Sequence, residues 1–296
     1  MFVWEQGWLV LLLLAFGNAG EAREKPVLFM RKSYLTMSNQ HIVLKDQTSQ
    51  GRVALITGAS RGIGAATARL FAAHGALVGV NYHRSEQEAF QIVREIEAVG
   101  GKALAVQASV DDPQQVAAMV KRVEEELGPI HTLVMNAAPT KCFAFAPFID
   151  FDWEVFEDMV LGELAGIYFP AQAVAPLMIQ RKQGNLIAVS SPLSRMGWPG
   201  ALAHATGKSG VDAMARVMAV ELGPSGIRVN TIAPGAVKTD SNPMSEEAKQ
   251  ISISTTPLRR VTQAEDVAGA IYLLALDEAG FISGSYTAAS GGQYIP

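Results

Sequence analysis

A glycine-rich segment has the spacing of a phosphate-binding turn. Thr57-Gly58-Ala59-Ser60-Arg61-Gly62-Ile63-Gly64 follows the apolar run 53–56 and precedes the apolar-rich run 65–71. This order predicts a strand, a glycine turn and a helix. Glycines at these positions permit a tight turn and a close backbone approach, so a pyrophosphate can lie on the free N–H groups at the helix N-terminus. The segment therefore predicts a dinucleotide site.

Charged side chains near the second predicted strand indicate which dinucleotide this turn would bind. The strand ends at Asn81 rather than at a carboxylate, with Arg61 in the glycine turn and Arg84 just beyond the strand. A carboxylate would accept the ribose hydroxyls of NAD, whereas guanidinium groups suit a 2′-phosphate in geometry and charge. The sequence therefore favours NADP over NAD, although either arginine could also be an ordinary solvated surface residue.

Length and composition set limits on the other possibilities. The chain has 296 residues, 49% of them hydrophobic, and a formal net charge of −4, so it can bury one large core or two small ones. The near-balanced charge gives no reason to expect nucleic-acid binding. The single cysteine, Cys142, cannot form an internal disulfide and is interpreted as a packing residue. Five scattered histidines lack metal-ligand spacing, so no metal site is expected.

The first fifty residues differ in character from the rest. The apolar run Trp8–Phe16 is too short to span a bilayer and resembles the core of a signal peptide, but Glu5 stands where a positive charge should precede it. We interpret 1–50 as a signal-like leader, an extension or the result of a mis-assigned start, with Met37 as a natural start. No stable membrane span is expected. A cytoplasmic location is favoured, and export is the alternative if 1–20 act as a signal peptide.

Apolar strands alternate with amphipathic helices from residue 51 to the end. The predicted strands are 53–56, 77–81, 103–107, 132–135, 185–190, 228–232 and 286–288, and the predicted helices after the glycine turn's own helix are 86–99, 113–127, 153–180 and 209–222. Alternation of this kind predicts an α/β fold, a Rossmann-like doubly wound parallel sheet with helices on both faces. One domain should therefore run over 51–296, with its ligand cleft at the carboxyl ends of the strands.

Further motifs follow the glycine turn in a characteristic order. They are Asn136-Ala137-Ala138, Ser190-Ser191, Lys208, Ile227-Arg228-Val229-Asn230 and Pro234-Gly235-Ala236-Val237-Lys238-Thr239. With this series the chain resembles the short-chain dehydrogenase/reductase family over 51–296, and is most similar to its 3-oxoacyl-acyl-carrier-protein reductase branch. The resemblance implies cofactor contacts by Gly58, Ser60, Arg61, Gly62, Ile63, Gly64, Asn81, Arg84, Ser109, Val110, Asn136, Ala137, Lys208, Pro234, Gly235, Val237 and Thr239. Ser109 departs from the family pattern, which has an aspartate contacting adenine there.

The resemblance also implies a catalytic set, and two of its four members have changed. In the family, a serine orients the substrate carbonyl, a tyrosine donates the proton, a lysine binds the ribose and an asparagine holds a water relay. Ser191 and Lys208 match, whereas His204 replaces the tyrosine and Glu163 replaces the asparagine. No replacement tyrosine stands nearby, since the position that enoyl reductases use corresponds to Ala201.

Histidine could still supply the proton. It titrates near neutrality and is the commonest general acid, and Glu163 could neutralise the charge of Lys208. Its ring reaches about 2 Å less far than a phenol, however, and misplacement on that scale can cost about 10²-fold in rate. We therefore expect an NADP(H)-dependent oxidoreductase that reduces a carbonyl substrate, with 3-oxoacyl compounds as a candidate class. The alternative is a weak or silent NADP(H)-binding relative that acts as a sensor or an oligomer subunit, with His204 as a mere helix residue.

Substrate and partners are less accessible from the residues. The family's mobile lid corresponds to 239–258, and Phe143, Phe145 and Phe148 could line an acyl or aromatic site or serve in packing. A basic residue found in some carrier-dependent members is Ser225 here, which counts modestly against a carrier-protein substrate. The resemblance implies a homotetramer or homodimer, formed through the helices 153–180 and 209–222 and the C-terminal strand.

Overall fold

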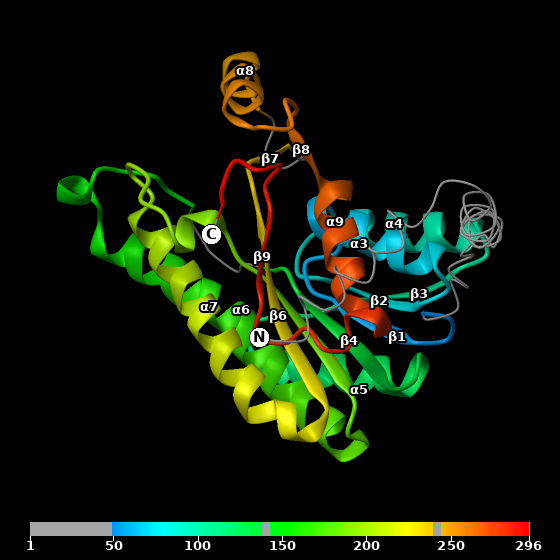
Figure 1. Cartoon of the computed structure of the whole chain (residues 1–296). Coiled ribbons are helices and arrows are strands. Elements are labelled where there is room, and N and C mark those ends of the chain that lie inside the picture. Colours follow the sequence, from blue (N-terminus) through cyan, green and yellow to red (C-terminus); the bar gives the residue numbers. More distant parts are fainter. Residues whose placement is uncertain (1–48, 138–142, 239–243, 296) are drawn as a thin grey trace, which may run out of the picture. The chain divides into compact units, whose positions relative to one another are not determined.

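A seven-stranded parallel sheet forms the centre of the protein. The computed structural model describes residues 49–137, 143–238 and 244–295, so residues 1–48 of the predicted leader 1–50, Cys142 and Thr239 lie outside the described residues. The strands lie in the order β3-β2-β1-β4-β5-β6-β9, and all pair in parallel (Figure 1). Their bounds are β1 (Val53–Ile56), β2 (Leu77–Tyr82), β3 (Lys102–Gln107), β4 (Ile130–Met135), β5 (Gly184–Val189), β6 (Ile227–Pro234) and β9 (Tyr286–Ala289). The predicted strands are thus confirmed to within two residues.

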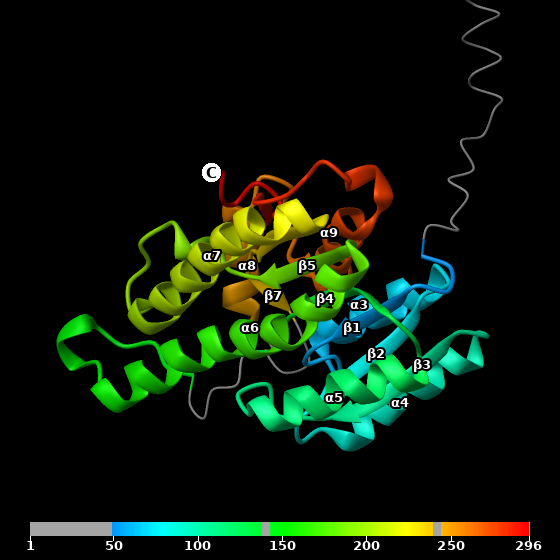
Figure 2. The same ribbon diagram turned by 90° about the horizontal axis from the view of Figure 1, so that it is seen from below.

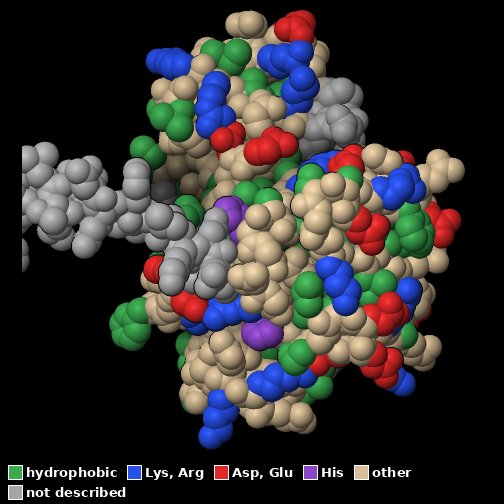
Figure 3. Space-filling model, turned by 90° about the vertical axis from the view of Figure 1, so that its right-hand side faces the viewer, with side chains coloured by type: hydrophobic (Ala, Val, Ile, Leu, Met, Phe, Trp, Pro, Cys, Tyr) green, Lys and Arg blue, Asp and Glu red, His purple; other side chains and the backbone are tan. Residues whose placement is uncertain are grey.

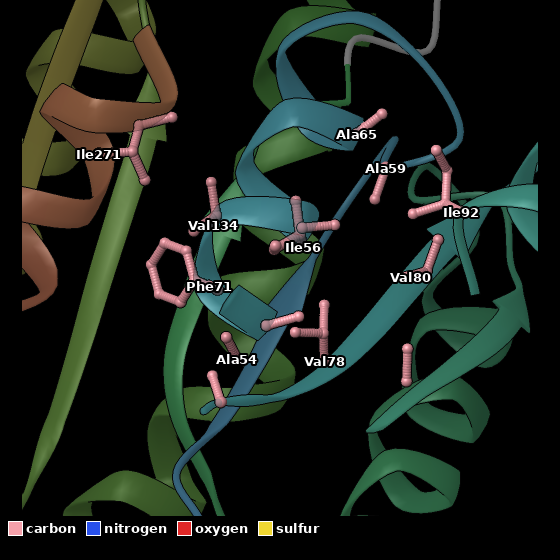
Figure 4. Close-up of a cluster of buried hydrophobic side chains, with 14 of the residues drawn as sticks. Ala54, Ile56, Ala59, Ala65, Phe71, Val78, Val80, Ile92, Val134 and Ile271 are labelled. Carbon is pink, nitrogen blue, oxygen red and sulfur yellow. The ribbon is translucent and has the colours of Figure 1, made fainter. Parts of the chain in front are cut away.

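Helices cover both faces of the sheet, as the alternating pattern predicted. On one face lie α3 (Gly62–Ala73), α4 (Glu86–Ala98) and α9 (Ala264–Ala275), and on the other α5 (Pro113–Glu126), α6 (Trp153–Arg181) and α7 (Leu202–Leu222) (Figures 1 and 2). Side chains of β1 alternate between the two cores: Ala54 and Ile56 pack on the first side (Figure 4), Val53 and Leu55 on the second. Burial on both faces explains why the strands read as continuous apolar runs.

The helix α7 begins seven residues earlier than the sequence predicted. The expected start at Ser209 is wrong, because α7 begins at Leu202 and runs through Gly207 without interruption. Glycine suggests a helix break in a sequence, but here it permits close packing: a Cβ at Gly207 would lie 2.9 Å from the Cβ of Glu163 on α6. The earlier start places His204 and Lys208 one turn apart on the same helical face.

Helix α6 has the length and apolar composition of a membrane span, and it alone does so among the described helices. Its side chains Ile167, Val174 and Met178 are buried in the second core, against the sheet. Packing within the domain therefore accounts for its composition.

Three features near the C-terminal end were not predicted as elements. Helix α9 was missed, although its Val267 and Ile271 are fully buried in the first core. The short strands β7 (Val237–Lys238) and β8 (Thr262–Gln263) pair in parallel. Helix α8 (Glu246–Thr255) lies within the predicted lid segment, at the top of the view in Figure 1. On the face shown in Figure 3, acidic and basic side chains are interspersed.

Candidate functional site

The glycine turn joins β1 to α3 at the point where the strand order reverses. Gly58 and Gly62 have φ angles of 63° and 56°, in the left-handed region that favours glycine. A Cβ at Gly64 would lie 2.4 Å from the carbonyl oxygen of Gly58, so only glycine fits there without a backbone shift. The first turn of α3 is thereby held close under the loop. Ligands of open α/β sheets bind at this switch point.

A cavity of about 530 Å³ opens beside this turn. It is lined by Gly58, Ser60, Arg61, Gly62, Ile63, Asn81, Tyr82, His83, Arg84, Ser85, Ala108, Ser109, Val110, Asp111, Asn136, Ala137 and Asp158. The structure therefore brings together eleven of the predicted cofactor residues. Gly64 supports the turn from beneath, whereas Lys208, Pro234, Gly235 and Val237 do not line this cavity.

Asn81 lines the cavity, but its side-chain amide is hydrogen-bonded to backbone groups. Its Oδ1 accepts a hydrogen bond from Gly58 N at 3.1 Å, and its Nδ2 donates to Ala108 O at 3.1 Å and Val106 O at 3.3 Å. The side chain is 1% exposed. Asn81 therefore ties the glycine turn to the end of β3, a structural task that its position in the sequence does not reveal.

Asn136 secures the same turn from β4. Its Nδ2 donates to the carbonyl oxygens of Thr57 at 3.0 Å and Gly58 at 3.2 Å, and its backbone N donates to Thr57 Oγ1 at 2.9 Å. Since Ala137 N also donates to Thr57 Oγ1, the end of β4 and the glycine turn form one rigid unit.

Six cavity residues were missed from the sequence: Tyr82, His83, Ser85, Ala108, Asp111 and Asp158. His83 could have been predicted from the sequence, because it stands next to Arg84 directly after the second strand. Asp111 could also have been predicted. It follows Ser109, the position where the family has an aspartate, by two residues, and its carboxylate accepts a hydrogen bond from the Ser109 hydroxyl. Asp158 comes from α6, far along the chain, and had no local signal.

Glu163 lies between His204 and Lys208 at the crossing of α6 and α7. Its Oε1 is 3.0 Å from His204 Nδ1, and its Oε2 is 2.7 Å from Lys208 Nζ in an ion pair. Lys208 also donates to Val189 O at 2.8 Å, at the end of β5. The Glu163 side chain is 2% exposed. The predicted contact between Glu163 and Lys208 is present, and the histidine joins it.

The carboxyl of Glu163 is ionised in this arrangement. Burial raises its pKa, but the charge of Lys208 and the hydrogen bonds from His204 and Lys208 outweigh burial and lower the pKa from 4.5 to about 2. Phe143 also packs against the imidazole, with the two ring centroids 5.3 Å apart in an edge-to-face arrangement. The histidine ring thus contacts both a carboxylate and an aromatic ring.

Acid should weaken the fold through Glu163. Because its folded-state pKa of about 2 lies below the ordinary value of 4.5, its ionisation stabilises the fold above pH 4.5, and this contribution is lost as the pH falls towards 2. The full effect is roughly 3 kcal/mol. Urea unfolding at pH 7, 4.5 and 3 should show a smaller loss for Glu163→Gln than for the parent protein. Equal losses would contradict this account.

Ser191 follows β5 and caps a short 3-10 turn, Pro192–Ser194. Its Oγ accepts from Leu193 N at 3.2 Å, and its carbonyl oxygen accepts from Tyr286 Oη at 3.1 Å and Ser194 Oγ at 2.7 Å. Within the described residues, its side chain makes no hydrogen bond to Glu163, His204 or Lys208. The connection is indirect, because Lys208 holds the carbonyl of Val189, two residues earlier.

A second buried carboxylate, Asp212 on α7, supports this turn and was missed from the sequence. It accepts hydrogen bonds from Ser190 Oγ at 2.5 Å and Ser194 Oγ at 2.6 Å, and Arg195 Nε lies 3.5 Å away. One indication of its role was present in the sequence: Asp212 stands between the apolar residues Val211 and Ala215 of a helix. Asp212 therefore braces the backbone on both sides of Ser191.

Comparisons with known proteins cover nearly all of the described domain. A family model described as enoyl-(acyl carrier protein) reductase matches residues 58–293. The chain is 35% identical over 243 residues to the 3-oxoacyl-(acyl-carrier-protein) reductase FabG of Staphylococcus aureus, which covers 82% of this chain and 98% of the relative.

Two solved structures with bound dinucleotides are also similar. A 7α-hydroxysteroid dehydrogenase complexed with NADH and 7-oxo glycochenodeoxycholic acid has a TM-score of 0.79 and 31% identity, over 85% of this chain and 99% of that one. A blue fluorescent protein from a metagenomic library, in complex with NADPH, has a TM-score of 0.75 and 32% identity, over 84% and 100%. The matched residues 58–293 include the glycines of the turn and all of the residues that line the cavity beside it.

Proposed function

Because the chain belongs to the short-chain dehydrogenase/reductase family and is an NAD(P)H-dependent oxidoreductase, we propose that it uses NADPH to reduce a carbonyl compound to an alcohol, with His204 as the proton donor. One observation carries the proposal. His204 Nδ1 lies 3.0 Å from a buried, ionised carboxylate, which in turn lies 2.7 Å from Lys208 Nζ. A histidine that merely filled a helix position would not need this arrangement.

The residues of the chain divide the remaining work. The nicotinamide cofactor, when bound, supplies the hydride, so the protein must orient the carbonyl and deliver one proton. Glu163 compensates the charge of Lys208, and a protonated His204 is therefore not opposed by an unpaired cation. Within the described residues, His204 Nε2 has no hydrogen-bond partner, which leaves it available to the substrate. Ser191 is proposed to orient the carbonyl, held in place by its braced backbone.

The direct test is NADPH oxidation by the purified full-length protein against a panel of ketones and 3-oxoacyl thioesters. Turnover with any of them supports the proposal. A 3-oxoacyl substrate is the first candidate, since the FabG relative is named for that class. Tight NADPH binding without turnover across the panel would instead favour a silent relative that senses the cofactor.

NADP preference is proposed from the cations that line the cavity. Arg61, His83 and Arg84 all line the cavity, and position 81 carries an asparagine rather than a carboxylate. A hydrogen bond to a charged group contributes about 1.5–3 kcal/mol. Arg61→Ala and Arg84→Ala should therefore each raise the Kd of NADPH by about tenfold or more, with little effect on NADH, in a fluorescence titration. Arg94→Ala, on α4 outside the cavity, is the control. Equal losses for both cofactors would contradict the assignment.

A homo-oligomer is proposed to form through α6 and α7. This helix pair carries exposed apolar side chains, among them Tyr168, Val217 and Val220, and Tyr168 and Val217 line a largely apolar hollow of about 460 Å³. Val217→Glu should lower the molar mass measured by light scattering after size exclusion, because it puts a charge into an apolar contact. Val99→Glu, at the exposed end of α4, should leave the mass unchanged. An unchanged mass for Val217→Glu would place the interface elsewhere.

A further inference from the structure

We propose that Glu163 and His204 form a coupled pair, in which Glu163 positions the histidine as the acid and each residue works only in the presence of the other. This rests on the proposed reduction. It goes beyond that proposal, because it assigns the reacting nitrogen and predicts that restoring a tyrosine at position 204 alone will not restore the family's chemistry.

The contact between the two side chains determines which ring nitrogen reacts. An ionised carboxylate can only accept hydrogen bonds, so the 3.0 Å contact between Glu163 Oε1 and His204 Nδ1 requires the hydrogen to be on Nδ1. In the neutral ring Nε2 is then the acceptor, and it is the nitrogen that gains and gives up the exchanging proton. Phe143 packs against the ring and limits its rotation. Glu163 is thus a positioning residue, because it acts through His204.

The net charge of the Glu163, His204 and Lys208 group, before and after proton donation, matches that of a group with tyrosine and asparagine at positions 204 and 163. With neutral His204, the charges of Glu163 and Lys208 cancel, and protonation of the histidine leaves one net positive charge. A tyrosine at 204 with an uncharged asparagine at 163 would pass through the same two states: one positive charge before proton donation and none after it. The two residues therefore replace such a pair as a unit.

Either substitution made alone, His204→Tyr or Glu163→Asn, should lower the rate of reduction. A tyrosine beside ionised Glu163 would donate its hydroxyl hydrogen to the carboxylate, and the nearby negative charge would oppose its ionisation. An asparagine at 163 would leave Lys208 without its counter-charge, so that a protonated His204 would be disfavoured by like charge. The buried position of Glu163, at 2% exposure, leaves little water to screen either effect.

The first experiment is a double-mutant cycle in the full-length protein: parent, His204→Tyr, Glu163→Asn and the double variant. The kcat for NADPH-dependent reduction of a carbonyl compound that the parent turns over should fall about 10²-fold or more in each single variant. The double variant should recover at least tenfold over either single variant, because the effects of coupled residues are not additive. A double variant no better than the poorer single variant, or a fully active His204→Tyr, would overturn the coupling. Thermal unfolding of all four proteins shows whether each is folded.

The second experiment does not need turnover. In protein with ¹⁵N-labelled histidine, the His204 ring signals are assigned by their loss in His204→Ala, and the tautomer is read at alkaline pH, where imidazoles are neutral. The parent should carry its hydrogen on Nδ1. Glu163→Gln should populate both tautomers, because an amide can donate as well as accept. A parent with its hydrogen on Nε2 would overturn the positioning role. A parent with the expected tautomer but no turnover on any carbonyl would contradict only the proposed reduction.

Discussion

Replacing His204 with alanine should abolish carbonyl-dependent NADPH oxidation, with a fall in kcat of about 10²–10⁴-fold. The reason is that the variant lacks the ring nitrogen that delivers the proton, while the cavity beside the glycine turn contains no part of His204. The Kd of NADPH should therefore stay within about threefold of the parent value, since no contact with the cofactor is removed. Stopped-flow or steady-state absorbance at the nicotinamide band measures the first quantity, and a fluorescence titration the second.

A control on the same helix separates chemistry from helix stability. Thr206 lies on the exposed side of the turn that carries His204, and among the described residues its hydroxyl donates only to Leu202 O, within the helix. Thr206→Ala should leave kcat unchanged. If His204→Ala retained full kcat, histidine would not be the proton donor. If it lost NADPH binding as well, the residue would serve the cofactor site instead.

Replacing Lys208 with methionine should destabilise the fold by about 3–5 kcal/mol. Lys208 is 7% exposed, and its Nζ lies 2.7 Å from Glu163 Oε2. Removal of the ammonium leaves a buried carboxylate without its counter-charge, which costs far more than the loss of one hydrogen bond. Urea unfolding at pH 7, followed by circular dichroism at a fixed protein concentration, measures the change in unfolding free energy.

A compensating variant tests the cause. In Glu163→Gln/Lys208→Met no buried charge remains unpaired, so the double variant should recover part of the stability that Lys208→Met loses. A double variant less stable than Lys208→Met would show that packing, rather than the unpaired carboxylate, governs the cost. The same set of variants also tests the acid-stability prediction, because the cost of Lys208→Met and the loss of stability in acid both depend on the ionised state of Glu163.

The local sequence pattern was sufficient to predict the strands of the sheet and the glycine turn. Apolar runs such as 53–56 and 185–189 are long enough to be recognised as strands. The glycine spacing at 58, 62 and 64 could be recognised because the left-handed backbone at 58 and 62 favours glycine and the close contact at 64 requires it. The same reasoning failed at the start of α7. The close approach of α6 that makes Gly207 necessary comes from a segment more than forty residues earlier, and it leaves no trace in the local sequence.

The sequence by itself determined the parallel α/β fold, the glycine turn and the types of the candidate residues Glu163, His204 and Lys208. Only the tertiary structure decided that α6 and α7 cross closely enough for Glu163 to contact both His204 and Lys208. It also decided that the side-chain amide of Asn81 is hydrogen-bonded to backbone groups. The physical reason lies in the range of the two effects. Periodicity and turn preferences act between near neighbours in the chain, whereas hydrogen bonds and ion pairs depend on atoms that approach within 3 Å only after distant segments have packed.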